Sequence, residues 1–482
     1  MYLGIDLGTS ALKALLIDED QRVIATRSER LDVARPSVGW SEQDPAGWVA
    51  AAEGALDSLK AAEPTALAAV RGIGLSGQMH GAVFIDAADR PLRPAILWND
   101  TRAHAEAAEL DGLPEFRALT GNIVFPGFTA PKVVWTHRNE PELFSRVAKV
   151  LLPKDFLRLW LTGEHVTDVS DASGTSWLHT EERCWSKRLL EYCQLDESQV
   201  PRLVEGTEVS GTLRPALTER WGMFPTTVVA GGGGDNAASG CGVGALASGT
   251  GFISIGTSGV VFVSADRYRA NPESAVHAFC HAVPNTWHQM GVALSAAGSL
   301  DWIAGVLDAR ADELVDGLGP LPVGPGAIQF LPYLSGERTP HNDAKVRGGF
   351  VGLDRAHGRS DLVQAVLEGV AFSFRDCLDA LTIPLSEPAQ LLAVGGGARS
   401  RHWLSIIATV LDLPIGVPAG GEVGAALGAA RLGLIAAENA DPFDVCAQPP
   451  LDDIVEPIAV LVDDYADAYR QYCRLYPAIK GL

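Results

Sequence analysis

The stretch LGIDLGTSALKALLI, residues 3–17, contains two apolar segments separated by Gly8-Thr9-Ser10. This pattern predicts two antiparallel strands joined by a tight glycine turn. A second stretch of the same design, FISIGTSGVVFV at residues 252–263, lies about half the chain further on. Because a repeat of this period is too long for a solenoid, it predicts two related domains that face each other.

The rest of the chain predicts an α/β fold with mixed sheets. Strands are expected at 82–86, 147–152, 226–231 and 390–394, and helices at 45–62, 103–111, 298–308, 360–381 and 422–437. We divide the chain into domains 1–243 and 244–482, and expect the hinge in the small-residue segment 239–249. A last helix at 461–476 places Tyr465, Tyr469, Tyr472 and Tyr476 on one face, which is typical of packing.

Composition limits the partners of this chain. Its 482 residues are 47% hydrophobic and 20% charged, which indicates a globular protein of more than one domain. The net charge of −21 argues against nucleic acid and anionic membranes as partners. Seven scattered cysteines without a CxxC pair argue against a disulfide framework or zinc knuckle, and the N-terminal residues resemble no secretion signal, so a cytoplasmic protein is expected.

The two glycine turns have the chemistry of phosphate sites. Gly8, Thr9 and Ser10 bring backbone N–H groups and hydroxyls together, and Gly256, Thr257 and Ser258 repeat the arrangement in the other half. Two such turns facing each other predict a cleft for a triphosphate, with Lys13 as a supplementary cation. The alternative is a pair of ordinary glycine turns in hairpins.

Two aspartates are candidate functional residues. Asp6 lies inside an apolar strand, where a carboxylate needs a partner or a cation, and hydrated Mg²⁺ held through water suits it. The alternative is that Asp6 caps its own turn. Asp235 follows four glycines, residues 231–234, which let another molecule come close. A carboxylate there predicts a general base for an attacking hydroxyl; an N-cap role is the alternative, and both can coexist.

Other glycine-rich segments are less specific. Residues 72–77, GIGLSG, match the spelling of a dinucleotide-binding motif, but residues 78–85 continue into a strand where that motif requires a helix. No GxxxxGK(S/T) sequence occurs, which excludes a P-loop. The polar Gln78 and His80 beside Met79 predict the rim of a small polyol pocket, or else an ordinary strand end.

Two segments of the C-terminal half complete the predicted cleft. The sequence GGGARS at 395–400 follows a strand and opens a helical stretch, so it is expected to receive adenosine and its nearer phosphates. Residues 330–340, FLPYLSGERTP, have the composition of a cleft wall, although a plain surface connection has the same composition.

The chain as a whole resembles the FGGY family of carbohydrate kinases. The resemblance runs from end to end and rests on these motifs: GIDLGTS (4–10), WSEQDP (40–45), GQMHGA (77–82), ILWND (96–100), GNIVFPGFTAPK (121–132), LLPKD (151–155), GGGGDNAA (231–238), IGTSGV (255–260), FLPYLSGERTPHN (330–342), AVLEGV (365–370) and GGGARS (395–400). It implies two actin-like, ribonuclease H-type domains flanking a cleft for ATP, Mg²⁺ and a sugar. The N-terminal domain would hold the sugar and the base, and the C-terminal domain the nucleotide.

The resemblance also implies a role for each matching residue. Asp235 would be the general base, and Asp6 would organise Mg²⁺ through water. The sugar would contact Gln78, Met79, His80, Asp235 and Asn236. The nucleotide would contact Gly8, Thr9, Ser10, Lys13, Gly256, Thr257, Gly396, Gly397 and Arg401.

The implied activity is ATP-dependent phosphorylation of a small ketose, D-xylulose, at its terminal hydroxyl, by a protein that could form a homodimer. One rival is a kinase of the same family for another ketose or polyol, such as ribulose. A rival of a different class is an actin-like ATPase that binds partners or acts as a chaperone, because a fold does not fix a function.

Overall fold

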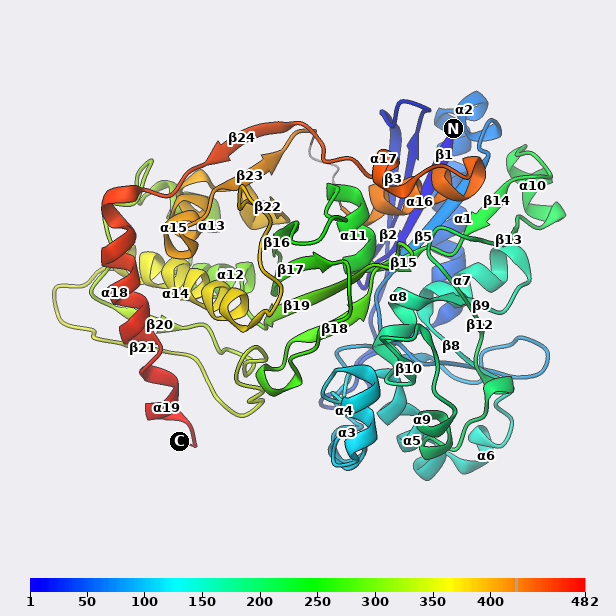
Figure 1. The fold of residues 1–482 in the computed structure, drawn as a ribbon, viewed down its shortest axis with the longest axis horizontal. Helices are drawn as coiled ribbons and strands as arrows, with labels where there is room; N and C mark the ends of the chain where they lie inside the picture. The colour runs from blue at the N-terminus through cyan, green and yellow to red at the C-terminus, as the bar shows by residue number, and fades with distance from the viewer. Residues whose placement is uncertain (421–423, 482) are drawn as a thin grey trace.

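The computed structural model describes residues 1–420 and 424–481, which form two α/β halves side by side (Figure 1). In Figure 1 the N-terminal half lies on the right, and the C-terminal half, which includes the red C-terminal helices, lies on the left. Within the described residues each half contains one seven-stranded sheet. Each sheet has its own buried core, represented by Leu3, Ile5 and Trp48 in one half and by Val261, Phe372 and Trp403 in the other.

The N-terminal sheet has the strand order β13-β14-β5-β1-β2-β3, with β15 beside β5. Strands β1 and β2 form the expected hairpin, in which Asp6 lies opposite Lys13, while β1 and β5 run parallel. The strands are β1 Tyr2–Leu7, β2 Ala11–Ile17, β3 Val23–Arg30, β5 Gly72–Gly77, β13 Val209–Thr212, β14 Val228–Ala230 and β15 Gly233–Gly234. The segment GIGLSG is therefore a central strand and no dinucleotide loop.

The C-terminal sheet repeats this topology. Its order is β18-β19-β17-β16-β22-β23-β24. Matching β16, β17, β19, β22, β23 and β24 with β1, β2, β3, β5, β14 and β13 gives the same order and the same parallel or antiparallel relation at every step. The strands are β16 Gly251–Ile255, β17 Gly259–Ala265, β18 His277–Cys280, β19 Trp287–Ala293, β22 Leu391–Val394, β23 Ile415–Pro418 and β24 Leu451–Val455. The predicted repeat of two related units is thereby confirmed.

The expected helices and strands are found close to their predicted limits. The helices are α1 Pro45–Ala62, α3 His104–Asp111, α12 Ala297–Val306, α14 Arg359–Ala380 and α16 Ala425–Glu438; residues 422–423 of the last prediction lie outside the described residues. The short strands β6 Val83–Ile85 and β8 Lys149–Leu151 pair with each other. Further elements used below are β9 Val166–Asp168, β20 Gln329–Leu331, β21 Gly349–Val351, α5 Thr129–Asn139, α7 Pro153–Thr162, α8 Val169–Ala172, α11 Asp235–Val243, α15 Arg401–Leu411, α18 Val462–Tyr472 and α19 Leu475–Ile479.

The predicted hinge at 239–249 is partly wrong, because α11 continues to Val243 and ends at Gly244 in the left-handed conformation. The small residues of α11 serve close packing. A Cβ on Gly242 would overlap the carbonyl oxygen of Gly424, at the start of α16. Of the predicted segment, only residues 245–249 lie outside the helix and its cap, in the irregular connection to β16.

Helix α16 comes from the C-terminal half of the sequence but packs between α11 and strands β1 and β5 (Figure 1). The contacts are backbone to backbone: a Cβ on Gly74 of β5 would overlap the carbonyl oxygen of Ala429, and one on Gly428 would overlap that of Ala238. The division of the chain at 243/244 stays a prediction. Helix α16 belongs by sequence to the second predicted domain, but it packs on the sheet of the first.

The C-terminal tyrosines pack as expected. Tyr465 donates a hydrogen bond to Glu368 (3.2 Å), Tyr469 to Asp376 (2.6 Å) and Tyr472 to the hydroxyl of Tyr333 (3.0 Å). The expected single helix is divided into α18 and α19, so Tyr476 lies on the second of the two. None of the helices in the described residues is both long and apolar enough to span a membrane.

The packing of α16 predicts opposite effects for two Gly→Ala substitutions in helices. Gly428→Ala should lower the free energy of unfolding by about 2–3 kcal/mol, because the added methyl meets the backbone of α11. Gly305→Ala, in α12, should raise it by about 0.5–1 kcal/mol, because no atom lies within 4 Å of the new Cβ and alanine favours helix. Denaturant unfolding followed by circular dichroism measures both; equal effects would contradict the close-packing argument.

Candidate active site

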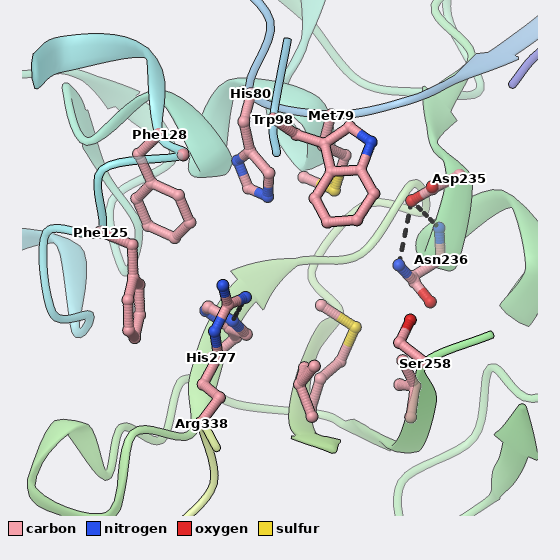
Figure 2. A pocket seen from close by; sticks show the side chains of 14 residues that line it. Met79, His80, Trp98, Phe125, Phe128, Asp235, Asn236, Ser258, His277 and Arg338 are labelled. Carbon is pink, nitrogen blue, oxygen red and sulfur yellow. Dashed lines mark hydrogen bonds between the residues drawn. The ribbon is translucent and has the colours of Figure 1, made fainter. Parts of the chain in front are cut away.

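A cavity of about 150 Å³ lies between the two halves (Figure 2). Both halves supply its walls. The N-terminal half contributes Met79, His80, Trp98, Phe125, Gly127, Phe128, Asp235 and Asn236, and the C-terminal half contributes Ser258, Val260, His277, Met290, Val292 and Arg338. Four of the predicted sugar-contacting residues, namely Met79, His80, Asp235 and Asn236, thus line one cavity.

Asp235 is the first residue of α11, directly after the glycine run. Its Oδ1 accepts hydrogen bonds from the backbone N–H (2.8 Å) and the Nδ2 (2.9 Å) of Asn236. Burial, and secondly the charge of Asp6, raises the pKa of this carboxyl to about 7. A carboxylate with such a pKa can accept a proton near neutral pH, and Oδ2 is left for a ligand.

A buried set of charged residues holds the glycine run in place. Arg158 of α7 donates hydrogen bonds to the carbonyl oxygens of Ala230 and Gly231. Ser170 of α8 accepts a hydrogen bond from the backbone N–H of Gly234 (3.1 Å) and donates one to Asp168. Asp168 in turn pairs with Lys154 at 2.8 Å. These contacts fix the backbone at both ends of the glycine run that leads into Asp235.

Asp6 lies at the end of β1 in a setting that suits a cation. Burial raises the pKa of its carboxyl, and a hydrogen bond with Ser76 and then the charge of Lys13 oppose this effect only in part. Its buried Oδ1 has no hydrogen-bond partner in the described part of the chain. A buried carboxylate with one unpartnered oxygen, whose charge also acts on Asp235, fits a hydrated Mg²⁺, which needs only one or two carboxylates besides phosphates and water. Among residues 1–420 and 424–481, no cluster of three or more potential protein ligands forms a metal site.

His80 is held in a strained backbone conformation, with a φ of 69°. Its Nδ1 lies 2.8 Å from the carbonyl oxygen of Gly174, so Nδ1 carries the proton and Nε2 is an acceptor. Burial lowers the pKa of His80 to about 3, which keeps the ring neutral. The buried Lys132 of α5 donates to the backbone oxygen of His80 (2.8 Å), and Phe128 stacks on the ring at 4.4 Å. This imidazole is therefore rigid.

Gln78 was predicted to contact the sugar, but in the structure its side chain is buried and does not line the cavity. Its Nε2 donates to Gln43 (2.8 Å) and its Oε1 accepts from the hydroxyl of Thr9 (3.0 Å). The same Thr9 hydroxyl accepts a hydrogen bond from Trp98 Nε1 (2.9 Å). Gln78 therefore supports the turn between β1 and β2, and Trp98 connects that turn to the cavity.

The predicted nucleotide residues divide into two groups. Gly396, Gly397 and Arg401 line a second cavity of about 650 Å³, built from residues of the C-terminal half alone. The turns at 8–10 and 256–258 lie at the ends of the equivalent hairpins β1–β2 and β16–β17. Of the two turns, only Ser258 is among the residues that line either cavity. Arg401 also pairs with Asp453.

Five of the cavity residues that were not predicted as site residues are aromatic or basic: Trp98, Phe125, Phe128, His277 and Arg338. Four of them lie in motifs that carry the family resemblance, at 96–100, 121–132 and 330–342. The spacing of His277, Cys280 and His281 would place them on one face of a helix, whereas the structure puts 277–280 on strand β18. No local pattern shows that these segments meet, because they come from distant parts of the sequence.

Comparisons with known proteins agree with this architecture. The N-terminal domain model of the FGGY family of carbohydrate kinases matches residues 1–242, and the C-terminal domain model matches residues 251–437. The xylulose kinase of Escherichia coli strain K12 is 45% identical over 485 residues, which cover 100% of both chains. The xylulose kinase of Bacillus subtilis strain 168 is 35% identical over 100% of this chain and 97% of its own.

Solved structures give the same result. A protein described as a xyloylose kinase from Brucella ovis is 57% identical and superposes with a TM-score of 0.96 over 99% of both chains. A gluconate kinase from Lactobacillus acidophilus is 26% identical, with a TM-score of 0.93 over 99% of this chain and 98% of its own. The predicted fold of two actin-like domains is confirmed. The chain therefore belongs to the FGGY family of carbohydrate kinases, for which ATP is the co-substrate.

Proposed function

We propose that this enzyme transfers the terminal phosphoryl group of ATP to the terminal hydroxyl of D-xylulose, giving D-xylulose 5-phosphate. The observation that carries the proposal is Asp235, a carboxylate with a pKa of about 7 in the wall of a small cavity between the two halves. The full-length likeness to xylulose kinases supports D-xylulose as the acceptor.

In the proposed mechanism Asp235 accepts the proton of the sugar hydroxyl as the oxygen attacks phosphorus. Asn236 holds Oδ1, so Oδ2 is the basic atom. The neutral His80 accepts a hydrogen bond from the sugar through Nε2, and Met79 and Asn236 complete the sugar contacts. Phosphoryl transfer depends mainly on positioning and charge stabilisation. The main contribution of these rigidly held cavity residues is therefore to orient the sugar hydroxyl for attack.

We assign the phosphates to the two glycine turns, with Gly8, Thr9, Ser10 and Lys13 on one side and Gly256 and Thr257 on the other. The adenosine end is assigned to the second cavity with Gly396, Gly397 and Arg401. Asp6 is the residue that would hold Mg²⁺ through water. When bound, Mg²⁺ would neutralise charge on the phosphates.

The base assignment predicts the effect of Asp235→Asn. The substitution should lower kcat by roughly 10²–10⁴-fold, because the amide cannot accept the proton. Asp361→Asn is the matched control, since Asp361 is also an acid in the first turn of a helix, α14, and caps Gly358 far from the cavity. A coupled assay for ADP release measures both variants. Activity of Asp235→Asn within tenfold of the unmodified enzyme would end the base assignment.

The raised pKa of Asp235 predicts how activity depends on pH. A carboxyl with a pKa of about 7 is protonated below that pH and cannot act as a base there. The value of kcat/KM for the sugar should therefore rise with pH and level off above about pH 7, falling tenfold per unit on the acid side. Recovery of activity after return from acid to neutral pH excludes denaturation as the cause. A profile flat from pH 5 to 8 would contradict the prediction.

A substrate panel tests the acceptor. ADP release should be fastest with D-xylulose, slower by roughly tenfold or more with D-ribulose and glycerol, and weak without sugar. A preference for D-ribulose would show a kinase for another ketose. Stimulation by unfolded peptides but by no sugar would instead favour an actin-like chaperone ATPase.

A further inference from the structure

Arg338 occupies a distinctive place in the cavity. It lies in the connection between β20 and β21, in the segment whose composition suggested a cleft wall. Figure 2 shows its guanidinium beside His277, on the side of the cavity opposite Asp235. Among the cavity-lining residues of the described chain, Arg338 is the only permanent cation and Asp235 the only carboxylate.

The guanidinium is poorly neutralised by the protein. Its Nη1 lies 3.3 Å from Nε2 of His277, and its Cζ lies 4.6 Å from the centre of the Phe125 ring. The neighbouring Glu337 uses Oε1 to accept the backbone N–H groups of Leu294 (2.9 Å) and Arg338 (2.7 Å), and its side chain makes no ion pair with the guanidinium in the described residues. Burial lowers the pKa of Arg338 to about 10, so it remains charged at neutral pH.

His277 does not neutralise this charge. Burial, and secondly the charge of Arg338, lowers the pKa of His277 well below its ordinary value, so its ring is neutral and accepts the hydrogen bond from Nη1. A guanidinium has five N–H donors and no acceptor. Its remaining donors at the cavity are suited to a ligand oxygen that only accepts, because a buried charge is costly without such partners.

We propose that Arg338 is a specificity-determining residue that binds the end of the substrate opposite the phosphorylated hydroxyl. It favours a carbonyl or carboxylate oxygen at that end over a hydroxyl. Under this proposal, which rests on the proposed function, the enzyme binds ketoses and the corresponding sugar acids in preference to sugar alcohols. The placement of Asp235 and Arg338 on opposite walls also sets the direction in which the sugar binds.

The test compares three five-carbon ligands that differ at that end: xylitol, D-xylulose and D-xylonate. Calorimetric titration of the full-length enzyme should show D-xylulose and D-xylonate binding roughly tenfold or more tightly than xylitol. In Arg338→Gln, binding of D-xylulose and D-xylonate should weaken roughly 10–100-fold, and binding of xylitol less than threefold. Arg338→Lys should retain part of the affinity for D-xylonate, because it keeps the charge but loses the planar fork.

The control is Arg347→Gln, which removes an exposed arginine from the same β20–β21 connection and should leave all three affinities unchanged. A purely structural role, in which Arg338 only supports Phe125 and His277, predicts equal losses for the three ligands. Equal losses, or equal affinity of the unmodified enzyme for xylitol and D-xylulose, would overturn the proposal.

The ADP-release assay separates this inference from the proposed function. If the unmodified enzyme phosphorylates no ketose, the proposed function fails. If it phosphorylates D-xylulose and Arg338→Gln leaves the ratio of kcat/KM for D-xylulose and xylitol unchanged, only the role of Arg338 fails. The expected result is a raised KM for D-xylulose with a smaller change in kcat, because Asp235 and its supporting contacts are untouched.

Discussion

The direct backbone contact of α16 with its neighbours is the constraint on which the site depends. Helix α16 lies against Gly74 of the central strand β5 on one side and against α11 on the other, where Gly428 meets the carbonyl of Ala238. No side chain fits in either contact. The strand β1 that carries Asp6 also packs on α16, so this helix sets the separation of the sheet from the helix that begins at Asp235. The two carboxylates therefore hold a fixed relation, in which the charge of Asp6 contributes to the pKa of Asp235.

A second constraint acts on the segment that follows β9, which consists of α8 and the 3-10 turn Ser173–Thr175. Ser170 accepts a hydrogen bond from the backbone N–H of Gly234. Four residues later, the carbonyl oxygen of Gly174 accepts a hydrogen bond from Nδ1 of His80. One short segment thus positions both the backbone before Asp235 and the imidazole on the sugar side. A Cβ on Gly174 would overlap the His80 ring, which explains why this position lacks a side chain. Rigid support of this kind lowers the cost of orienting a substrate.

Sequence patterns predicted what is local, because strands, turns and helices follow from residues close in the chain. The two hairpins and the position of Asp235 after four glycines are of this kind. Small residues are ambiguous in the sequence: they predict a hinge at 239–249, whereas in α11 they allow close helix contact. Gln78 and Met79 are neighbours, yet only Met79 reaches the cavity, and tertiary packing decides this. Arg338 and Asp235 lie on opposite walls of one cavity although they are distant in the sequence, and no local pattern reveals this.

The cavity proposed for the sugar has walls from both halves of the chain, a property that the cavity proposed for the nucleotide lacks. Its residues come from both halves, with Asp235 on one and Arg338 on the other, whereas the larger cavity at Gly396 and Gly397 is built from the C-terminal half alone. A sugar bound there as proposed contacts both halves at once, so its binding energy favours the arrangement in which they are close. A single water molecule cannot span these walls. Under the proposed function, the two-sided cavity therefore directs Asp235 toward a sugar hydroxyl and away from water, which limits futile hydrolysis of ATP.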